Sequence, residues 1–504
     1  MRPDLILRGG HIIDGSGAPG FGGDVAVAGG RIQEIGVVPQ VEGAEEIYTR
    51  GLTVAPGFID IHSHSDLTLL VDPRALSAVA QGVTTEVVGN CGHGCAPITD
   101  PAIAKAAIYG PVHAAAFDWR SIAGYLEKLE AARPAVNVVT LVPNGQLRLA
   151  VVGADRRAAT PDELGRMEQL LAEALEQGAA GFSTGLEYAQ EGGATEMEVT
   201  ALCKVVARVD GLYATHTRDR DAHAVAAVAE AVRTVRAAGV RLQVSHIVPR
   251  SGAEVTAQCL AVIDAARASG IAAEFDMHTR TFGFTHLKNL LPGWVLEGGA
   301  DEIAARLRDG AARARIAAHR NLITSLGDWE RVQLVHSDRF EPLNGLSFAE
   351  IGRSWSVAPL DAALRILLGH VDDILRPMVI LQSYSEDLLR DTYAHPRCMV
   401  GSDATTLAPT ARSRAKPSTA PTPGLRGSTA AWCARSDCSR RRRRSSDFRR
   451  CPPVHSASAI AVCSRGAHAP ISWRSIRRRS ARPERSRHPI DWRAACATSS
   501  STVS

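Results

Sequence analysis

Apolar runs of about five to seven residues recur along this chain, and helical patterns separate several of them. Short apolar runs bounded by turn residues favour buried strands, and strands that alternate with helices favour a parallel sheet with helices outside it. We predict eight such strands, at residues 58–62, 83–89, 136–142, 179–183, 211–216, 240–246, 271–277 and 398–402. Eight strands fit a (β/α)8 barrel.

Three of the intervening segments carry clear helix signals. We predict helices at 162–177, 221–238 and 255–268, which end at Gly178, at Gly239 and at Ser269-Gly270. The first follows Thr160-Pro161, a capping residue and then a proline at the first helical position. The gap of residues 279–397 is too long for one crossover, which predicts an insertion between the last two strands.

The N-terminal segment has a different pattern from the rest. Residues 4–14 and 24–36 have the pattern of short strands joined by glycine-rich turns, and Gly29-Gly30 is a hairpin signal. We therefore assign residues 1–56 to a small β domain and residues 57–409 to the barrel.

Composition is that of an ordinary globular protein, with 504 residues, 45% hydrophobic and 22% charged. No apolar run reaches about 18 residues, so we expect no membrane span. The first ten residues lack the apolar core of a signal peptide, so we expect a cytoplasmic protein.

Charge divides the chain into two unlike parts. Residues 410–504 have a net charge of +17 and residues 1–409 a net charge of −13, which together give the +4 of the whole. The C-terminal part is rich in Arg, Ser, Ala and Pro and has no hydrophobic periodicity. A nucleic-acid-binding arm or a disordered linker would account for it, but the composition favours an out-of-frame translation of GC-rich codons. We assign it no role and expect no nucleic-acid partner.

Residues with metal-binding chemistry follow the predicted strands. Residues two apart in a strand share a face, so His62 and His64 can point together into the barrel mouth. Taken singly, each such histidine or cysteine is more often structural. Active sites of these barrels lie at the C-terminal ends of the strands, so ligands at several ends converge. These residues are His62, His64, Cys91, His216, His246 and Asp403. Cys91 and the nearby Cys95 could instead be an inert pair or a redox couple.

The motifs resemble the metal-dependent amidohydrolase superfamily, and within it the D-aminoacylase (N-acyl-D-amino-acid deacylase) family. The resemblance covers residues 4 to about 409. It rests on Gly57-Phe58-Ile59-Asp60-Ile61-His62-Ser63-His64-Ser65-Asp66, Gly89-Asn90-Cys91-Gly92, Gly181-Phe182-Ser183-Thr184-Gly185-Leu186-Glu187-Tyr188, Thr215-His216-Thr217-Arg218, Val244-Ser245-His246 and Gly401-Ser402-Asp403.

The resemblance implies a metal barrel with a small β-sandwich built from both chain ends. It implies that Cys91, His216 and His246 form a tight Zn²⁺ site, and that His62 and His64 belong to a second, weaker or vacant one. Asp403 resembles the catalytic acid/base. The implied reaction is zinc-assisted hydrolysis of the amide bond of a small N-acyl-D-amino acid.

This chain departs from the family pattern where a substrate carboxylate is held. The family's Lys, Tyr and Ser are replaced by Val248, His278 and Phe284. Arg250 or Arg280 could supply a substitute cation, with His278 as a further weak candidate, although a surface or salt-bridged arginine is the more common case.

Two other functions remain open from sequence. A cyclic-amide hydrolase of the dihydroorotase or hydantoinase kind would share the fold, but usually has a lysine where Cys91 stands. Alternatively, the chain is the inactive product of a frameshifted gene.

Overall fold

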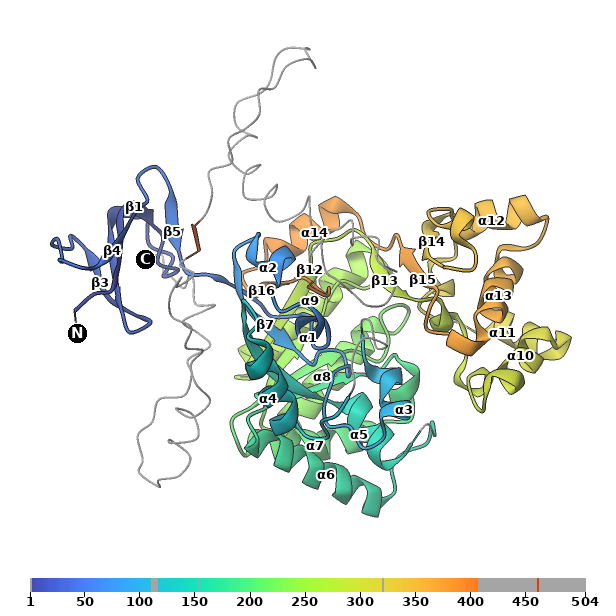
Figure 1. Ribbon diagram of the computed structural model, residues 1–504. Helices are drawn as coiled ribbons and strands as arrows, with labels where there is room; N and C mark the ends of the chain where they lie inside the picture. The colour runs from blue at the N-terminus through green and yellow to red at the C-terminus, as the bar shows by residue number, and fades with distance from the viewer. Residues whose placement is uncertain (1, 110–116, 154, 320, 407–459, 462–504) are drawn as a thin grey trace, which may run out of the picture.

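The protein is described here by a computed structural model that covers residues 2–109, 117–153, 155–319, 321–406 and 460–461. It has three parts: an N-terminal sheet, a central barrel and an insertion on the side of the barrel opposite to that sheet (Figure 1). The prediction for residues 410–504 therefore lies outside the described residues, apart from Ile460 and Ala461.

The barrel has the eight predicted strands, all parallel, in the order β16-β12-β11-β10-β9-β8-β7-β6. Each strand begins and ends within a few residues of its predicted bounds. The strands are β6 (Phe58–Asp60), β7 (Val83–Val88), β8 (Asn137–Pro143), β9 (Gly181–Gly185), β10 (Leu212–His216), β11 (Arg241–Val244), β12 (Ala273–His278) and β16 (Cys398–Gly401).

Backbone hydrogen bonds join the first and last strands at their C-terminal ends. The N–H of Asp403 donates to the carbonyl of His62, and the N–H of His64 donates to the carbonyl of Ala404, both at 2.8 Å. Gly401 permits this approach, because a Cβ there would lie 2.5 Å from the Cβ of His62. The barrel is thereby closed at the end where the active sites of such barrels lie.

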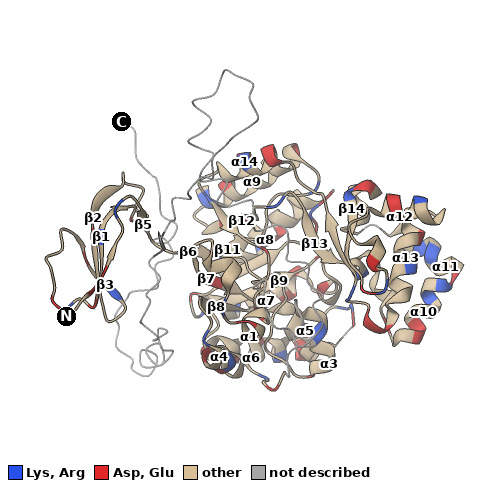
Figure 2. Ribbon diagram, turned by 45° about the horizontal axis from the view of Figure 1, so that its top comes forward, with Lys and Arg blue, Asp and Glu red and all other residues tan. Residues whose placement is uncertain are grey.

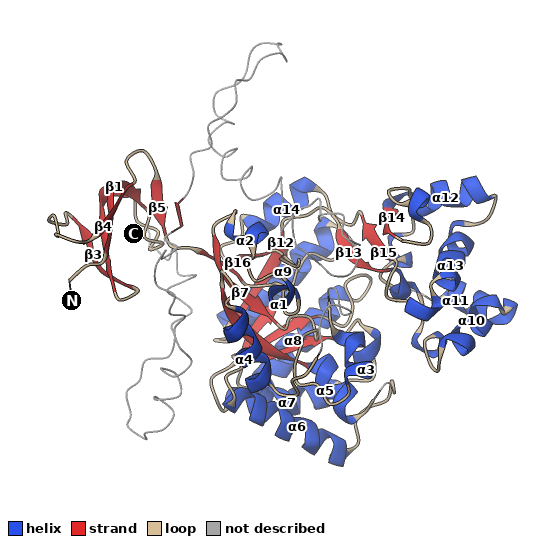
Figure 3. Cartoon of the chain, viewed as in Figure 1, coloured by secondary structure: helices blue, strands red, loops and turns tan. Residues whose placement is uncertain are grey.

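Helices surround the strands (Figure 3). They are α1 (Thr68–Val71), α2 (Leu76–Val79), α3 (Pro101–Ala104), α4 (Ile122–Ala132), α5 (Asn144–Val151), α6 (Pro161–Glu176), α7 (Glu196–Ala207), α8 (Ala224–Ala238), α9 (Ala253–Ala268) and α14 (Glu386–Tyr393). No helix among the described residues combines the length and the apolar character needed to cross a membrane.

The three predicted helices are present, with small differences at their ends. Thr160 and Glu163 form a capping box at the start of α6, as the Thr-Pro signal indicates. Helix α8 begins at Ala224 rather than at Asp221. The Oδ1 atom of Asp219 accepts the N–H groups of Asp221 and His223, which holds these residues in a loop.

The predicted insertion has its own apolar core, which includes Leu334, Phe348 and Leu367. Both signs of charge are interspersed over its helices (Figure 2). It consists of an antiparallel sheet of β13 (Gly283–His286), β14 (Val332–His336) and β15 (Met378–Leu381), with α10 (Ala300–Arg308), α11 (Gly310–Ala318), α12 (Phe348–Trp355) and α13 (Pro359–Gly369).

The N-terminal segment forms one sheet in the described residues, in which Gly29-Gly30 makes the predicted hairpin between β2 and β3. The prediction that the C-terminal end of the chain completes a β-sandwich falls on residues outside the described ones, apart from Ile460 and Ala461. The sheet contains β1 (Leu5–Ile12), β2 (Phe21–Ala28), β3 (Arg31–Gly36), β4 (Glu45–Tyr48), β5 (Thr53–Ala55) and β17 (Ile460–Ala461), of which β17 pairs with β5.

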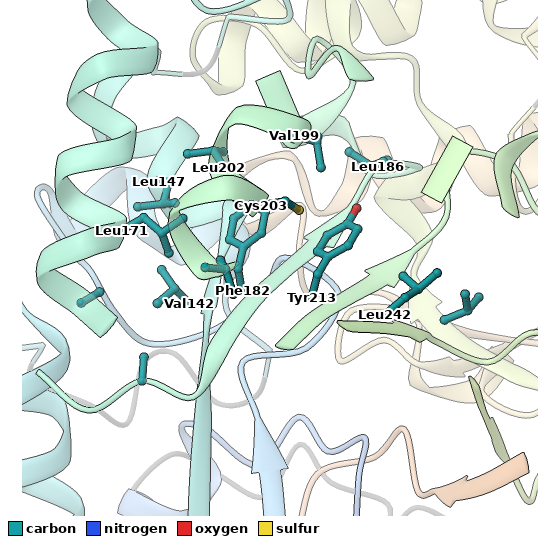
Figure 4. Close-up of a cluster of buried hydrophobic side chains, with 14 of the residues drawn as sticks. Val142, Leu147, Leu171, Phe182, Leu186, Val199, Leu202, Cys203, Tyr213 and Leu242 are labelled. Carbon is teal, nitrogen blue, oxygen red and sulfur yellow. The ribbon is translucent and has the colours of Figure 1, made fainter. Parts of the chain in front are cut away.

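The main core lies between the strands and their helices. Figure 4 shows Phe182 and Tyr213, from neighbouring strands, beneath Leu202 and Cys203 of α7. The rings of Phe182 and Tyr213 are stacked with their centroids 5.8 Å apart, and both side chains are fully buried. This contact packs β9 and β10 against α7, while the C-terminal ends of the two strands carry polar residues.

We expect Phe182→Ala to lower the free energy of unfolding by about 3–5 kcal/mol, because it leaves a cavity in this core. Met197→Ala in α7 is the control, since Met197 is 75% exposed. The measurement is denaturant unfolding of both variants. Equal effects would show that the barrel wall does not depend on this contact.

Candidate metal centre

Every residue predicted to have metal-binding or catalytic chemistry lies at a C-terminal strand end. His62 and His64 follow β6, Cys91 follows β7, His216 ends β10, His246 follows β11 and Asp403 follows β16. All six are buried except Asp403, which is partly buried. Cys95 is also buried but belongs to no metal-binding group of the described residues.

Cys91 is the common member of two potential metal-binding groups. The donor atoms of Cys91, His216 and His246 lie within 4.8 Å of one another, and so do those of Cys91, His62 and His64. The Sγ atom of Cys91 is 3.2 Å from Nε2 of His62 and 3.5 Å from Nε2 of His246. The arrangement can hold one metal ion, or two that share the thiolate.

His216 is oriented by a carboxylate. Its Nε2–H donates to Oε2 of Glu187 at 2.8 Å. Its Nδ1 atom is buried without a hydrogen-bond partner among the described residues. A ring nitrogen kept bare by the bond of the other nitrogen is the form in which histidine binds a metal.

Asp276, near the C-terminal end of β12, holds the residues that follow β6 and β11. Its Oδ1 atom accepts from Nδ1 of His62 at 3.1 Å and from the N–H of His246 at 2.8 Å. The bond to His62 leaves Nε2 of that ring facing Cys91. A thiolate with neutral imidazoles is a donor set that suits Zn²⁺, so these residues fit the ion that the sequence predicts.

Charge at the cluster favours ionised Cys91. Burial opposes the thiolate, but His62 and His246 together bring the pKa of Cys91 well below its usual value. Burial likewise opposes the charged form of His62, yet the charges of Cys91 and Asp276 raise its pKa well above the ordinary value. The cluster thus stabilises negative charge on sulfur, which a metal ligand requires.

Asp403 lies beside the second group. Its Oδ1 is 3.2 Å from Nε2 of His64 and 3.6 Å from Nε2 of His62. Its Oδ2 is 3.2 Å from Nη2 of Arg280 and 4.0 Å from Nε2 of His278. Burial opposes ionisation, but His64, His62 and Arg280 hold the pKa of Asp403 well below its usual range. The group is a carboxylate that can accept a proton.

Three of the eight non-glycine residues with a positive φ among the described residues lie at these strand ends. Cys91, His246 and Asp403 have φ angles of 54°, 37° and 45°, in the left-handed region that non-glycine residues seldom adopt. Such strain persists where surrounding contacts determine the conformation, and it clusters at functional sites.

The two arginines considered as substitute cations are both ion-paired. Arg250 is buried between Glu187 and Asp221, and Asp221 Oδ2 lies 2.8 Å from its Nη2. Arg280 donates to the side chain and to the carbonyl of Asp403, the latter at 2.6 Å. Arg250 therefore holds the carboxylate of Glu187 that contacts His216. Both arginines already have a carboxylate partner within the protein.

Some residues of the site had no assigned role from sequence. Asp276 and Glu187 stand at or just after a strand end, which is the signal that could have identified them. His93 was not singled out either: its Nδ1–H donates to the Cys91 carbonyl at 2.8 Å, and burial lowers its pKa to about 3. The ring of Tyr109 lies 4.6 Å from that of His64 and 4.5 Å from that of His93.

A parallel barrel with histidines, a cysteine and a carboxylate at its strand ends defines the class of metal-dependent barrel hydrolases. Comparisons with known proteins agree. Residues 45–337 match the Amidohydrolase family. N-acyl-D-glutamate deacylase of Alcaligenes xylosoxydans xylosoxydans is 32% identical to this chain over an alignment that covers 79% of this chain and 73% of the deacylase. D-aminoacylase of the same organism is 40% identical over an alignment that covers 48% of this chain and 50% of the D-aminoacylase.

Solved structures show the same relationship. The N-acyl-D-glutamate deacylase of Bordetella bronchiseptica, complexed with zinc and a phosphonate mimic of the tetrahedral intermediate, aligns with a TM-score of 0.65 at 30% identity. The alignment covers 80% of this chain and 76% of the deacylase chain. A D-aminoacylase structure aligns with a TM-score of 0.65 at 31% sequence identity, over the same shares of the two chains. The chain belongs to the amidohydrolase family, with D-aminoacylases among its relatives.

We expect Arg250→Met to lower the free energy of unfolding by about 3–5 kcal/mol, because it leaves the buried Asp221 and the partly buried Glu187 without their cation. Arg233→Met is the matched control, since its ion pair with Glu196 is exposed and worth about 1 kcal/mol or less. Thermal and denaturant unfolding measure both. A loss no larger than that of the control would contradict the buried pairing.

Proposed function

We propose that the protein is a zinc-dependent hydrolase of the amide bond of N-acyl-D-amino acids. The observation that carries the proposal is the convergence of Cys91, His216 and His246 beside an ionised Asp403. The named relatives support the substrate class, since they are deacylases of N-acyl-D-glutamate and N-acyl-D-aspartate and a D-aminoacylase.

In this proposal Cys91, His216 and His246 hold zinc, with His62 and His64 completing a second position around the shared thiolate. When bound, zinc supplies a Lewis acid that polarises the scissile carbonyl and acidifies water. Glu187 keeps the Nδ1 atom of His216 available, and Asp276 does the same for Nε2 of His62.

Asp403 is the proton carrier of the proposed reaction. As a carboxylate it accepts the proton of the attacking water, and as an acid it returns that proton to the leaving nitrogen. His64, at 3.2 Å from Oδ1, and Arg280, at 3.2 Å from Oδ2, hold the carboxylate in place between these steps.

The proposal is tested by incubating the purified full chain, with zinc added, with N-acetyl-D-amino acids, their L enantiomers and a 5-substituted hydantoin. We expect carboxylate release from the D compounds and little from the others. A zinc-loaded, folded chain that releases nothing from any N-acyl amino acid would overturn the assignment, and ring opening of the hydantoin would favour the cyclic-amide alternative.

We expect about one tightly held zinc per chain, and its loss in Cys91→Ala, because the thiolate is common to both groups of ligands. Cys95→Ala is the control, since that cysteine is buried four residues away and belongs to neither group. Metal analysis after dialysis is the measurement. Unchanged zinc content in Cys91→Ala would exclude the thiolate as a ligand.

We expect Asp403→Asn to retain zinc but to lose roughly 10²–10⁴-fold in turnover, because the amide keeps the shape and cannot carry the proton. Ser402→Ala serves as the control, since Ser402 is next to Asp403 but its hydroxyl contacts Asp60 and the backbone carbonyl of His62, not the carboxylate of Asp403. Steady-state rates and metal content are measured on the same samples. A rate within about threefold of the parent would place the base elsewhere.

A further inference from the structure

One buried cation beside the metal centre has no counter-ion. Arg220, in the loop between β10 and α8, is only 7% exposed, and no carboxylate of the described residues lies within ion-pair distance of it. A buried charge is costly unless it is paired. Arg250 and Arg280, its neighbours in the site, each have a carboxylate partner, so Arg220 differs from them.

The hydrogen bonds of Arg220 place it against the metal centre. Its Nη2 atom donates to the carbonyl of His246 at 2.6 Å, to the carbonyl of Val248 at 2.9 Å and to the hydroxyl of Tyr384 at 2.9 Å. One terminal nitrogen of the guanidinium makes all three of these hydrogen bonds. Among the described residues, Nε and Nη1 have no acceptor, so donors remain for a ligand.

Two further polar groups lie beside this guanidinium. The ring of Tyr384 contacts that of His278, with centroids 5.3 Å apart. The Nδ1 atom of His278 accepts the backbone N–H of Arg280 at 3.3 Å. The neutral ring therefore carries its proton on Nε2, 4.0 Å from Oδ2 of Asp403. A cation, a phenol and an imidazole N–H thus follow one another from Arg220 to the proposed proton carrier.

We propose that Arg220, with Tyr384 and His278, binds the carboxylate of the substrate. The inference rests on the proposed function, because the carboxylate is that of the N-acyl amino acid whose amide lies at the metal. The hydrogen bond to the carbonyl of Val248 holds the guanidinium of Arg220 beside the segment that follows β11. A guanidinium is suited to carboxylate recognition, since its donors form strong charge-assisted hydrogen bonds.

The test compares two compounds of nearly the same shape, N-acetyl-D-leucine and its primary amide, in which a neutral amide replaces the charged carboxylate. Binding is measured by calorimetry on the full chain carrying Asp403→Asn, with zinc added, so that turnover does not interfere. We expect the acid to bind at least about tenfold more tightly than the amide. When Arg220→Met is added to this chain, the affinity for the acid should fall by about 10- to 100-fold, and the affinity for the amide should stay within about threefold. Arg220→Lys should give an intermediate value.

Arg218→Met is the matched control, because Arg218 lies two residues away and is already paired with Glu230 at 2.8 Å. It should leave the preference for the acid unchanged. Thermal melting of each variant shows whether it is folded. The inference would be overturned if the chain carrying only Asp403→Asn bound the acid and the amide equally well, or bound neither. It would also be overturned if Arg220→Met lowered the affinity for both compounds equally, because Arg220 would then only hold the loop in place.

The outcome is separable from that of the proposed function. If the chain with Asp403 intact hydrolyses neither compound, yet the preference for the acid depends on Arg220, the deacylase assignment fails and the carboxylate site stands. If the chain hydrolyses N-acetyl-D-leucine without any preference that depends on Arg220, the deacylase assignment stands and the inference fails.

Discussion

Closure of the barrel at the ends of β6 and β16 is the constraint on which the site depends. The two backbone hydrogen bonds that link His62 and His64 to residues 403 and 404 join segments more than 300 residues apart in sequence. They bring the histidine pair and Asp403 to within 3.6 Å of each other. Because these links are made by backbone atoms, the side chains remain available for chemistry.

Charge compensation then decides how each side chain is used. Glu187 is held by Arg250, which is held in turn by Asp221, so the carboxylate behind His216 is fixed and ionised. Burial opposes that charge, but Arg250 and His216 bring the pKa of Glu187 well below its usual range. Second-layer carboxylates of this kind set the tautomer and orientation of a metal-binding histidine. The position of His216, a proposed ligand, is therefore determined by residues outside the proposed ligand set.

The fold and the strand-end residues were largely predictable from sequence, because both follow from local rules. Strand length, helix capping at Thr160 and the location of active sites in such barrels need no long-range information. The role of Arg220 could not be predicted in this way. It depends on which of several buried charges meet in three dimensions. Arg220 is flanked in sequence by Asp219 and Asp221 and forms an ion pair with neither among the described residues, whereas Arg250, which has no acidic neighbour in sequence, pairs with two carboxylates. The start of α8 was misplaced for a related reason, since a side-chain cap by Asp219 competed with the helix.

The left-handed residues connect the closure of the barrel to the chemistry. Cys91, His246 and Asp403 each leave their strand through a φ angle between 37° and 54°. This turn redirects the chain at the point where the side chain faces the barrel mouth. Such a conformation is unfavourable for non-glycine residues, so it must be held by neighbouring contacts. For His246 that contact is the N–H bond to Asp276, and for Asp403 it is the N–H bond to the His62 carbonyl. The same hydrogen bonds that close and brace the barrel thus maintain the strained geometry of the residues that we propose bind metal and carry the proton.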